Sequence, residues 1–154
     1  MRLEPLLELD LTAVLSGVKN RDAALDAVAE RGASKFPVVT RSAFMAALKE
    51  RESKYPTGTP EGVAFPHALL PEVPRTALVC LLLRPAVKWS TQNHPGQDVI
   101  FGILGNVEAP WEHVRLLARL ARIVRSPGAL ERVRSCADGK GLLQRLIEED
   151  RAHG

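Results

Sequence analysis

Apolar residues recur along the chain at two spacings, which separate predicted helices from predicted strands. Spacings of three and four residues indicate the buried face of a helix, whereas short unbroken apolar runs bounded by turn-forming residues are consistent with buried strands. We therefore expect helices over residues 22–31, 40–51, 110–124, 129–136 and 140–150, and strands over residues 62–65, 76–83 and 98–104. Near-continuous apolar strands are typical of a sheet with helices on both faces, so the pattern predicts a three-layer α/β/α fold.

Residues at the ends of the predicted helices support these boundaries. Thr40 can cap the second helix, and Gly32 is expected to end the first. Pro110 suits the first position of the third helix, and Glu112 is favourable in its first turn near the positive end of the helix dipole. The sequence Ser126-Pro127-Gly128 is expected to end that helix.

Length and composition predict a single domain over residues 1–154. The first residues lack the basic start and apolar run of an export signal, and the longest apolar run, residues 77–83, is too short to cross a bilayer. Cys80 and Cys136 show no metal-binding spacing, although a single disulfide between them stays open. We therefore expect a cytoplasmic protein without membrane insertion.

The charge pattern bears on the choice of partner. A net charge of +3 would suit nucleic acid, but the aromatic content of 5% is low for base stacking, so no nucleic-acid partner is expected. Arg115, Arg119 and Arg122 are expected on the solvent side of the helix over residues 110–124. They form either a solvated face or a docking patch for an acidic partner.

His67 is the leading candidate for chemistry. Residues 53–60 are rich in turn-forming residues and predict an exposed loop, which the short strand over residues 62–65 follows. Pro66 keeps Phe65 extended, so His67 is expected just outside the sheet, at a strand end. A neutral imidazole can accept a phosphoryl group on one nitrogen while a hydrogen bond holds the other.

Two other side chains could complete such a site. His113, in the first turn of its helix, could donate to phosphoryl oxygens, and the guanidinium group of Arg51 could add a bidentate clamp. From spacing alone, a structural role explains His67 as well as a catalytic role does, and it explains His113 better.

The remaining chemistry is less well supported. His94 is expected to be solvated in the turn over residues 93–96, and His153 lies in the tail. A zinc site of His67, His94 and His113 would need ligands from three distant segments without any ligand motif. No glycine-rich nucleotide-binding fingerprint is present, so we expect neither a metal nor a cofactor.

Residues 51–68, RESKYPTGTPEGVAFPHA, resemble the active-site stretch of a known family. This family comprises the enzyme IIA domains of the fructose/mannitol and nitrogen-regulatory class of the bacterial phosphoenolpyruvate:sugar phosphotransferase system. The matching pieces are the pair Arg51-Glu52, the loop Pro56-Thr57-Gly58 and the segment GVAFPH over residues 62–67. A second match is Glu112-His113 at the start of a leucine-rich helix, and the resemblance extends over essentially the whole chain.

The resemblance implies a mixed sheet of about five parallel and antiparallel strands flanked by helices. It implies that His67 is phosphorylated by the phosphocarrier HPr or its nitrogen-branch counterpart. The phosphoryl group would then pass to a IIB domain or serve as a regulatory state. By position, His113 would support the phosphoryl group and Arg51 would order or neutralise the site. The alternative is a regulatory module that controls partner proteins according to its phosphorylation, without a role in sugar transport.

The chain departs from the family pattern in its loops and surface. Pro60 and Glu61 in the loop over residues 58–62 are expected to crowd the approach to His67. Residues 105–109, GNVEA, replace a proline-bearing loop. The arginine-rich helix faces would repel a basic docking patch on HPr, which bears on the choice of phosphoryl donor.

Overall fold

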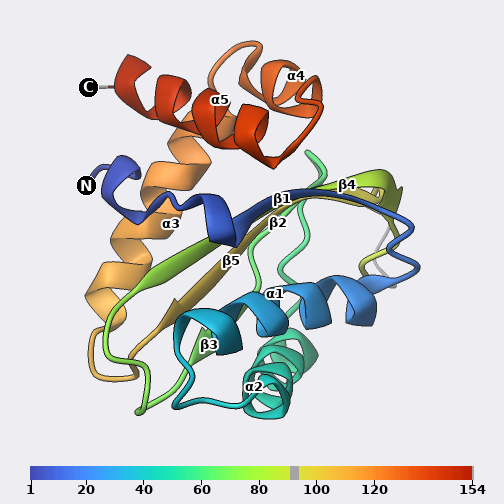
Figure 1. Ribbon diagram of the computed structural model, residues 1–154. Helices are drawn as coiled ribbons and strands as arrows, with labels where there is room; N and C mark the ends of the chain where they lie inside the picture. The colour runs from blue at the N-terminus through green and yellow to red at the C-terminus, as the bar shows by residue number, and fades with distance from the viewer. Residues whose placement is uncertain (91–93, 154) are drawn as a thin grey trace.

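The computed structural model describes residues 1–90 and 94–153, and a five-stranded sheet forms its centre (Figure 1). The strands are β1 (Thr12–Ser16), β2 (Val63–Ala64), β3 (His67–Leu69), β4 (Ala77–Val87) and β5 (Gln97–Gly105). Their order is β1-β4-β5-β2, and β3 also pairs with β5. The β4–β5 pair is antiparallel, whereas β1 runs parallel to β4, and β2 and β3 run parallel to β5. The predicted mixed sheet is confirmed.

Helices cover both faces of this sheet (Figure 1). They are α1 (Arg21–Lys35), α2 (Arg41–Lys54), α3 (Pro110–Val124), α4 (Ala129–Arg134) and α5 (Gly139–Ala152), with short 3-10 turns η1 (Glu4–Leu6) and η2 (Leu9–Leu11) near the N-terminus. Helices α1 and α2 pack on one face, and α3, α4 and α5 on the other. The three-layer prediction is therefore confirmed.

Alternation along β5 divides the core into two parts. Ile100 and Leu104 pack with residues of α1 and α2, whereas Phe101 and Ile103 pack with residues of α3 and α5. Successive side chains of a strand point to opposite faces, so an unbroken apolar strand is buried on both sides. Each face is closed by helices whose own apolar side chains complete the cluster.

Side-chain caps explain where three of the helices begin. The side-chain oxygen of Asn20 accepts a hydrogen bond from the Ala23 amide at 2.8 Å. At the start of α2, the Thr40 hydroxyl accepts from the Ala43 amide at 3.1 Å, as predicted. Asp138 similarly caps α5. Each cap satisfies an amide that has no partner within its helix.

The prediction that Gly32 ends the first helix is wrong. Helix α1 continues to Lys35, and Gly32 is buried inside it. A Cβ at this position would lie 2.9 Å from Cδ1 of Leu104 and 3.1 Å from the ring of Phe44. The glycine therefore allows α1 to approach β5 and α2 closely, and it does not act as a stop.

Arg119 does not face solvent, which corrects the predicted arginine stripe. Its side chain is only 8% exposed and donates two hydrogen bonds to Oδ1 of the fully buried Asp150, at 2.9 and 2.8 Å. The carboxylate lies on α5, which the helical pattern of α3 alone could not place beside it. Arg115 and Arg122 are exposed, as predicted.

Other predicted boundaries need smaller adjustments. Helix α2 continues to Lys54, so it takes up the first residues of the predicted loop over residues 53–60. The predicted turn over residues 93–96 includes Asn93, which lies outside the described residues. Within the part of the chain that is described, no helix is both long and apolar enough to cross a membrane.

Candidate functional site

His67 is the first residue of β3, not a residue outside the sheet, which corrects its predicted placement. It lies opposite Ile103 in the β3–β5 register, and the Pro66 carbonyl accepts a hydrogen bond from the Ile103 amide at 2.8 Å. Pro66 itself cannot donate to the sheet, so β2 and β3 remain two short strands on either side of it. The pairing of β3 with β5 therefore holds the backbone of His67 in place.

The side chain of His67 is half-buried and opens on a small hollow. The hollow has a volume of about 230 Å³, and the residues that line it come from α2 and β3: Ala47, Glu50, Arg51, Lys54, His67 and Leu69. Pro60 and Glu61 are not among them, so the predicted crowding by the loop over residues 58–62 does not occur at this opening. Two cations and one carboxylate from the last turns of α2 surround the approach to the imidazole.

His113 reaches the same region from the opposite layer. Its ring is only 3% exposed and lies directly over Gly105, where a Cβ would come within 1.9 Å of the His113 Nε2 atom. Gly105 is opposite Leu69 in the β3–β5 register, two positions along from His67. The missing side chain at Gly105 thus makes room for the second imidazole beside β3.

Buried ring nitrogens without partners mark this pair of histidines. Within the described residues, Nδ1 of His67 and both ring nitrogens of His113 are the buried side-chain polar atoms that lack a hydrogen-bond partner. Buried polar groups are normally paired, and an unpaired group costs roughly 1–3 kcal/mol. Unpaired nitrogens beside an accessible imidazole are suited to a polar ligand that arrives during function.

The electrostatic environment keeps His67 neutral. Its pKa is lowered from 6.5 to about 4, mainly by burial and also by the nearby positive charge of Arg51 and the proximity of His113, while the backbone carbonyl of Phe65 partly offsets these effects. Burial also lowers the pKa of His113, against the opposing effect of Glu112. A neutral imidazole keeps the lone pair that nucleophilic attack requires.

Arg51 lies in the last turn of α2 and lines the hollow with His67. Its Nη1 donates to the Tyr55 carbonyl at 2.6 Å, which fixes the guanidinium group at the end of the helix. Its remaining donors are available to an anion in the hollow. The structure therefore places Arg51 in the hollow with His67, and it places His113 near His67 from the opposite layer, although His113 does not line the hollow.

The buried carboxylate of Glu52 holds the loop between α2 and β2. The sequence alone had assigned this residue no role. Glu52, only 2% exposed, accepts hydrogen bonds from the Thr57 amide at 3.0 Å, from the Thr57 hydroxyl and from Nε1 of Trp89 at 3.2 Å. The Thr57 carbonyl in turn accepts from the Phe65 amide at 3.2 Å, two residues before His67. Glu52 thus connects α2, the loop and the strand that carries His67.

One sequence feature could have identified Glu52. Phe44, Leu48 and Glu52 follow one another at four-residue intervals, so helical periodicity places the carboxylate on the buried face of α2. A charged residue on a buried face needs partners. The tryptophan that supplies one of them comes from a distant segment and was not predictable from this pattern.

A second polar residue anchors the other end of the loop. The side chain of Gln97, fully buried, donates from Nε2 to the Thr59 carbonyl at 2.9 Å and accepts at Oε1 from the Thr59 amide at 3.1 Å. Gly62 follows with a φ of +86°, a conformation that glycine adopts at little cost. The loop between α2 and β2 is therefore held from both sides.

The other nucleophiles and ligands considered lie elsewhere. His94 and His153 do not line the hollow, and Nδ1 of His153 contacts the Glu149 carbonyl at 2.9 Å. Both cysteines are free, and burial raises the pKa of the Cys80 thiol. Among residues 1–90 and 94–153, no three His, Cys, Asp or Glu side chains gather as metal ligands would, so the three-histidine arrangement considered for zinc does not form.

Comparison with known proteins identifies relatives of this chain. The relatives found by sequence include two proteins named "Nitrogen regulatory protein". The one from Bradyrhizobium diazoefficiens is 29% identical over 126 residues, covering 81% of each chain, and the one from Pseudomonas aeruginosa is 27% identical over 150 residues, covering 96% of each.

Solved structures show the same fold. The nitrogen regulatory protein IIA-Ntr from Neisseria meningitidis superposes with a TM-score of 0.84 at 20% identity, covering 94% of this chain and 98% of that one. IIA mannitol from Escherichia coli superposes with a TM-score of 0.71 at 20% identity, covering 91% and 98%.

The family itself follows from a match along nearly the full chain. Residues 5–149 match the model of the family described as "Phosphoenolpyruvate-dependent sugar phosphotransferase system, EIIA 2". This match contains the loop, β3 and α3 with the two histidines. The chain belongs to the EIIA 2 family of the phosphoenolpyruvate-dependent sugar phosphotransferase system.

Proposed function

We propose that this phosphotransferase-system protein carries a phosphoryl group on His67. It accepts the group from an HPr-like phosphocarrier and either passes it to a IIB component or keeps it as a regulatory state. The observation that carries the proposal is the buried, unpartnered Nδ1 of His67, in a hollow that Arg51 also lines and near the unpartnered ring nitrogens of His113. Anion-accepting groups surround a neutral nucleophile.

The transfer follows from the state of the imidazole. Nδ1 of His67 is buried, which leaves Nε2 to reach a phosphoryl donor. With the proton on Nδ1, the lone pair of Nε2 forms the new N–P bond while the donor's N–P bond breaks and its electron pair returns to the donor ring. The Nδ1 proton is released and the donor ring takes up a proton, so both histidines end neutral. Positioning and charge stabilisation supply most of the catalysis in such a step.

The two supporting side chains act on the transferred group. A ring N–H of His113 donates to one phosphoryl oxygen, and Arg51 neutralises charge on the others with two parallel N–H donors. Charge-assisted hydrogen bonds of this kind are roughly twice as strong as neutral ones. The space over Gly105 places His113 near the imidazole, and the end of α2 places Arg51 in the same hollow as His67.

Phosphoryl transfer is tested by labelling with phosphoenolpyruvate, enzyme I and HPr. We expect a base-stable, acid-labile phosphate on the wild-type protein and on His94→Ala, and none on His67→Ala. Arg51→Ala and His113→Ala should be labelled at least tenfold more slowly, because each removes an anion contact from the transition state. Normal labelling of His67→Ala would refute the assignment of the acceptor.

A regulatory module is the second candidate function. It is favoured by the relatives at 29% and 27% identity, both named as nitrogen regulatory proteins. A solved complex of E. coli IIA mannitol with phosphorylated IIB mannitol, at a TM-score of 0.71 and 18% identity, illustrates the transfer alternative for that protein. Both uses need the same phosphohistidine, which adds negative charge to the hollow that Arg51 and Lys54 line.

The two uses are separated by following the label. Transfer predicts that phosphorylated protein loses its phosphate within seconds to a purified IIB component. Regulation predicts instead that binding to a partner protein differs between the wild-type protein and the charge mimic His67→Asp. Identical binding by both forms, together with rapid loss of phosphate to IIB, would assign the protein to transfer.

A further inference from the structure

Three arginines at one site lack the partners that other arginines of this protein have. They are Arg115 and Arg122 on α3 and Arg125 at its C-terminal cap. In the described residues every other arginine has an ion pair, a hydrogen bond or a ring contact, as in the pairs Arg132 with Glu149 and Arg134 with Asp98. Among residues 1–90 and 94–153, the guanidinium groups of these three have no such partner.

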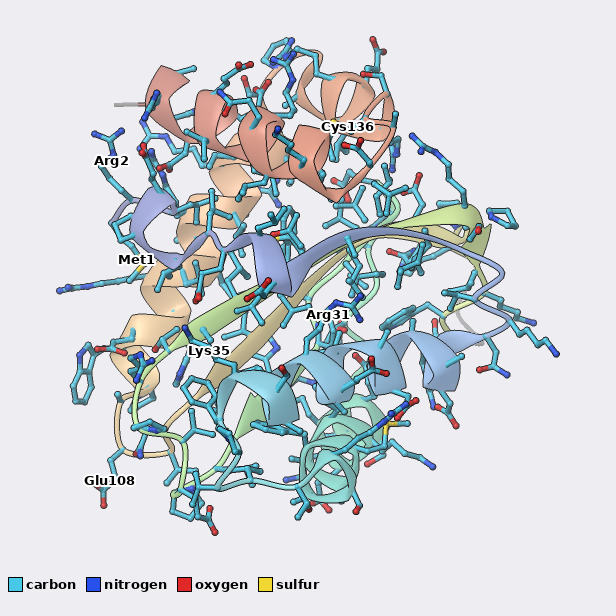
Figure 2. All side chains as sticks on the ribbon, viewed as in Figure 1. Met1, Arg2, Arg31, Lys35, Glu108 and Cys136 are labelled. Atoms are coloured by element: carbon cyan, nitrogen blue, oxygen red, sulfur yellow. The ribbon has the colours of Figure 1, made fainter. Side chains whose placement is uncertain are left out.

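The three arginines border two adjoining depressions along α3. One part, about 420 Å³, is lined by Met1, Arg115, Ala118, Arg119 and Arg122. The other, about 600 Å³, is lined by Ala118, Ala121, Arg122, Arg125, Ser126, Pro127 and His153. The two parts share Ala118 and Arg122, and together they are named the basic groove. Figure 2 shows Met1 and Arg2 beside α3, where the N-terminal segment forms one wall.

The stability of α3 does not account for this arrangement. Cations are favourable near the C-terminus of a helix, which explains Arg122 and Arg125, but Arg115 lies in the second turn, too far from the C-terminus to gain from this effect. The one acid of α3, Glu112, accepts a hydrogen bond from Thr76 at 2.6 Å and forms no ion pair with Arg115. Three like charges on one exposed side also repel one another.

The shape and chemistry of the basic groove favour an elongated anionic ligand. With a rise of about 1.5 Å per residue, Arg115 and Arg125 lie about 15 Å apart along the helix axis. The floor between them is made of Ala118 and Ala121, whose small side chains let another backbone approach closely. No Phe, Tyr or Trp lines the groove, which removes the stacking platform that single-stranded nucleic acid uses.

We propose that the basic groove is a docking site for an acidic helix of a partner protein, whose carboxylates pair with Arg115, Arg122 and Arg125. Guanidinium groups bind carboxylates bidentately, and the alanine floor accommodates the partner's backbone. No groove residue lines the hollow at His67, so this site does not depend on the proposed phosphoryl transfer. Partner binding and phosphoryl exchange would therefore use separate surfaces.

The test measures binding of a fluorescent helical peptide by anisotropy. The probe is an alanine-rich peptide whose glutamates repeat the spacing of the three arginines, and a second peptide carries the same glutamates scattered around its helix. The triple variant Arg115→Gln/Arg122→Gln/Arg125→Gln is compared with Lys19→Gln/Lys88→Gln/Lys140→Gln. The control removes the same charge from three exposed lysines that form no ion pair in the described residues.

The expected result is specific to the arginines and to the spacing. The arginine variant should bind the matched peptide about tenfold more weakly than the wild-type protein, since three exposed ion pairs with the peptide are lost. The affinity of the lysine variant for the matched peptide should fall less than twofold. The wild-type protein should bind the scattered peptide about as weakly as the arginine variant binds the matched peptide. His67→Ala should bind the matched peptide with wild-type affinity.

Three outcomes would overturn the proposal. Equal losses in the two triple variants would show attraction to net charge alone, and equal binding of both peptides would show that the groove does not recognise spacing. Tighter, arginine-dependent binding of single-stranded oligothymidine would assign the surface to nucleic acid. The triple arginine variant could unfold more easily in urea than the wild-type protein. In that case the single variant Arg115→Gln should still bind the matched peptide about twofold more weakly. Wild-type affinity in this single variant would also refute the proposal.

Discussion

Titration of His67 offers a direct test of the proposed nucleophile. Burial and Arg51 hold its pKa at about 4, well below the 6.5 expected for the unfolded chain. The imidazole therefore binds a proton more weakly in the folded state than in the unfolded state. Stability is complete above about pH 6.5 and falls as the pH approaches 4, because the unfolded chain takes up the proton first.

The magnitude follows from the two pKa values. Each pH unit of difference corresponds to about 1.4 kcal/mol, so the whole interval from 6.5 to about 4 is worth roughly 3 kcal/mol. At about pH 4.5 the loss for His67 alone should be about 2.5 kcal/mol. The pKa of His113 is also lowered, so His113 also destabilises the folded protein as the pH falls. This contribution is present in the His67 variants as well, so the comparison with them isolates the effect of His67.

Two measurements check this reasoning. The NMR shifts of the imidazole protons should show that His67 titrates near pH 4, and that Arg51→Gln raises its midpoint, since a repelling charge is removed. Urea unfolding at about pH 7.5 and pH 4.5 should show that the wild-type protein loses about 2.5 kcal/mol more than His67→Gln over this range. A midpoint for His67 above about pH 6, or equal acid sensitivity of the two proteins, would refute the account of a buried, neutral imidazole.

Three further substitutions test the surrounding structure. Gly105→Ala places a Cβ 1.9 Å from the ring of His113, so phosphoryl labelling should slow at least tenfold with little change in the far-ultraviolet spectrum; an unchanged rate would remove His113 from the site. Glu52→Gln should lower the free energy of unfolding in urea by about 1–3 kcal/mol, since a buried charged acceptor is lost, and no change would contradict the loop network. Arg119→Met should cost about 3–5 kcal/mol in the same assay because its buried partner is left charged, whereas Arg122→Met should cost less than about 0.5 kcal/mol; similar values would contradict the observed difference in burial.

Local pattern predicted most of the helices and the central strands. Apolar runs over residues 76–83 and 98–104 correspond to β4 and β5, and the cap at Thr40 and the proline at Pro110 begin α2 and α3. These features depend on side-chain spacing and on the backbone needs of single residues, which are properties of neighbouring positions in the chain. Gly32 shows the limit, since a glycine that ends a helix and one that permits close packing look alike in sequence.

The candidate site was predicted residue by residue but not as an arrangement. The resemblance identified His67, His113 and Arg51, yet the pairing of β3 with β5 and the space over Gly105 bring the two histidines to one place. The buried network of Glu52 needed Trp89, which lies 37 residues away along the chain. Contacts over such distances depend on how the layers pack, which local periodicity does not encode.

By itself, the sequence determined the α/β class and most of the helices and strands, and it named the candidate side chains for phosphate chemistry. Only the tertiary structure decided that His67 begins a strand, that Arg119 is buried against Asp150, and that three arginines along α3 have no partner among the described residues. The reason is physical. Periodicity reports which face of an element is apolar, whereas the pKa of an imidazole or the pairing of a guanidinium group depends on charges and cavities supplied by elements distant in the chain.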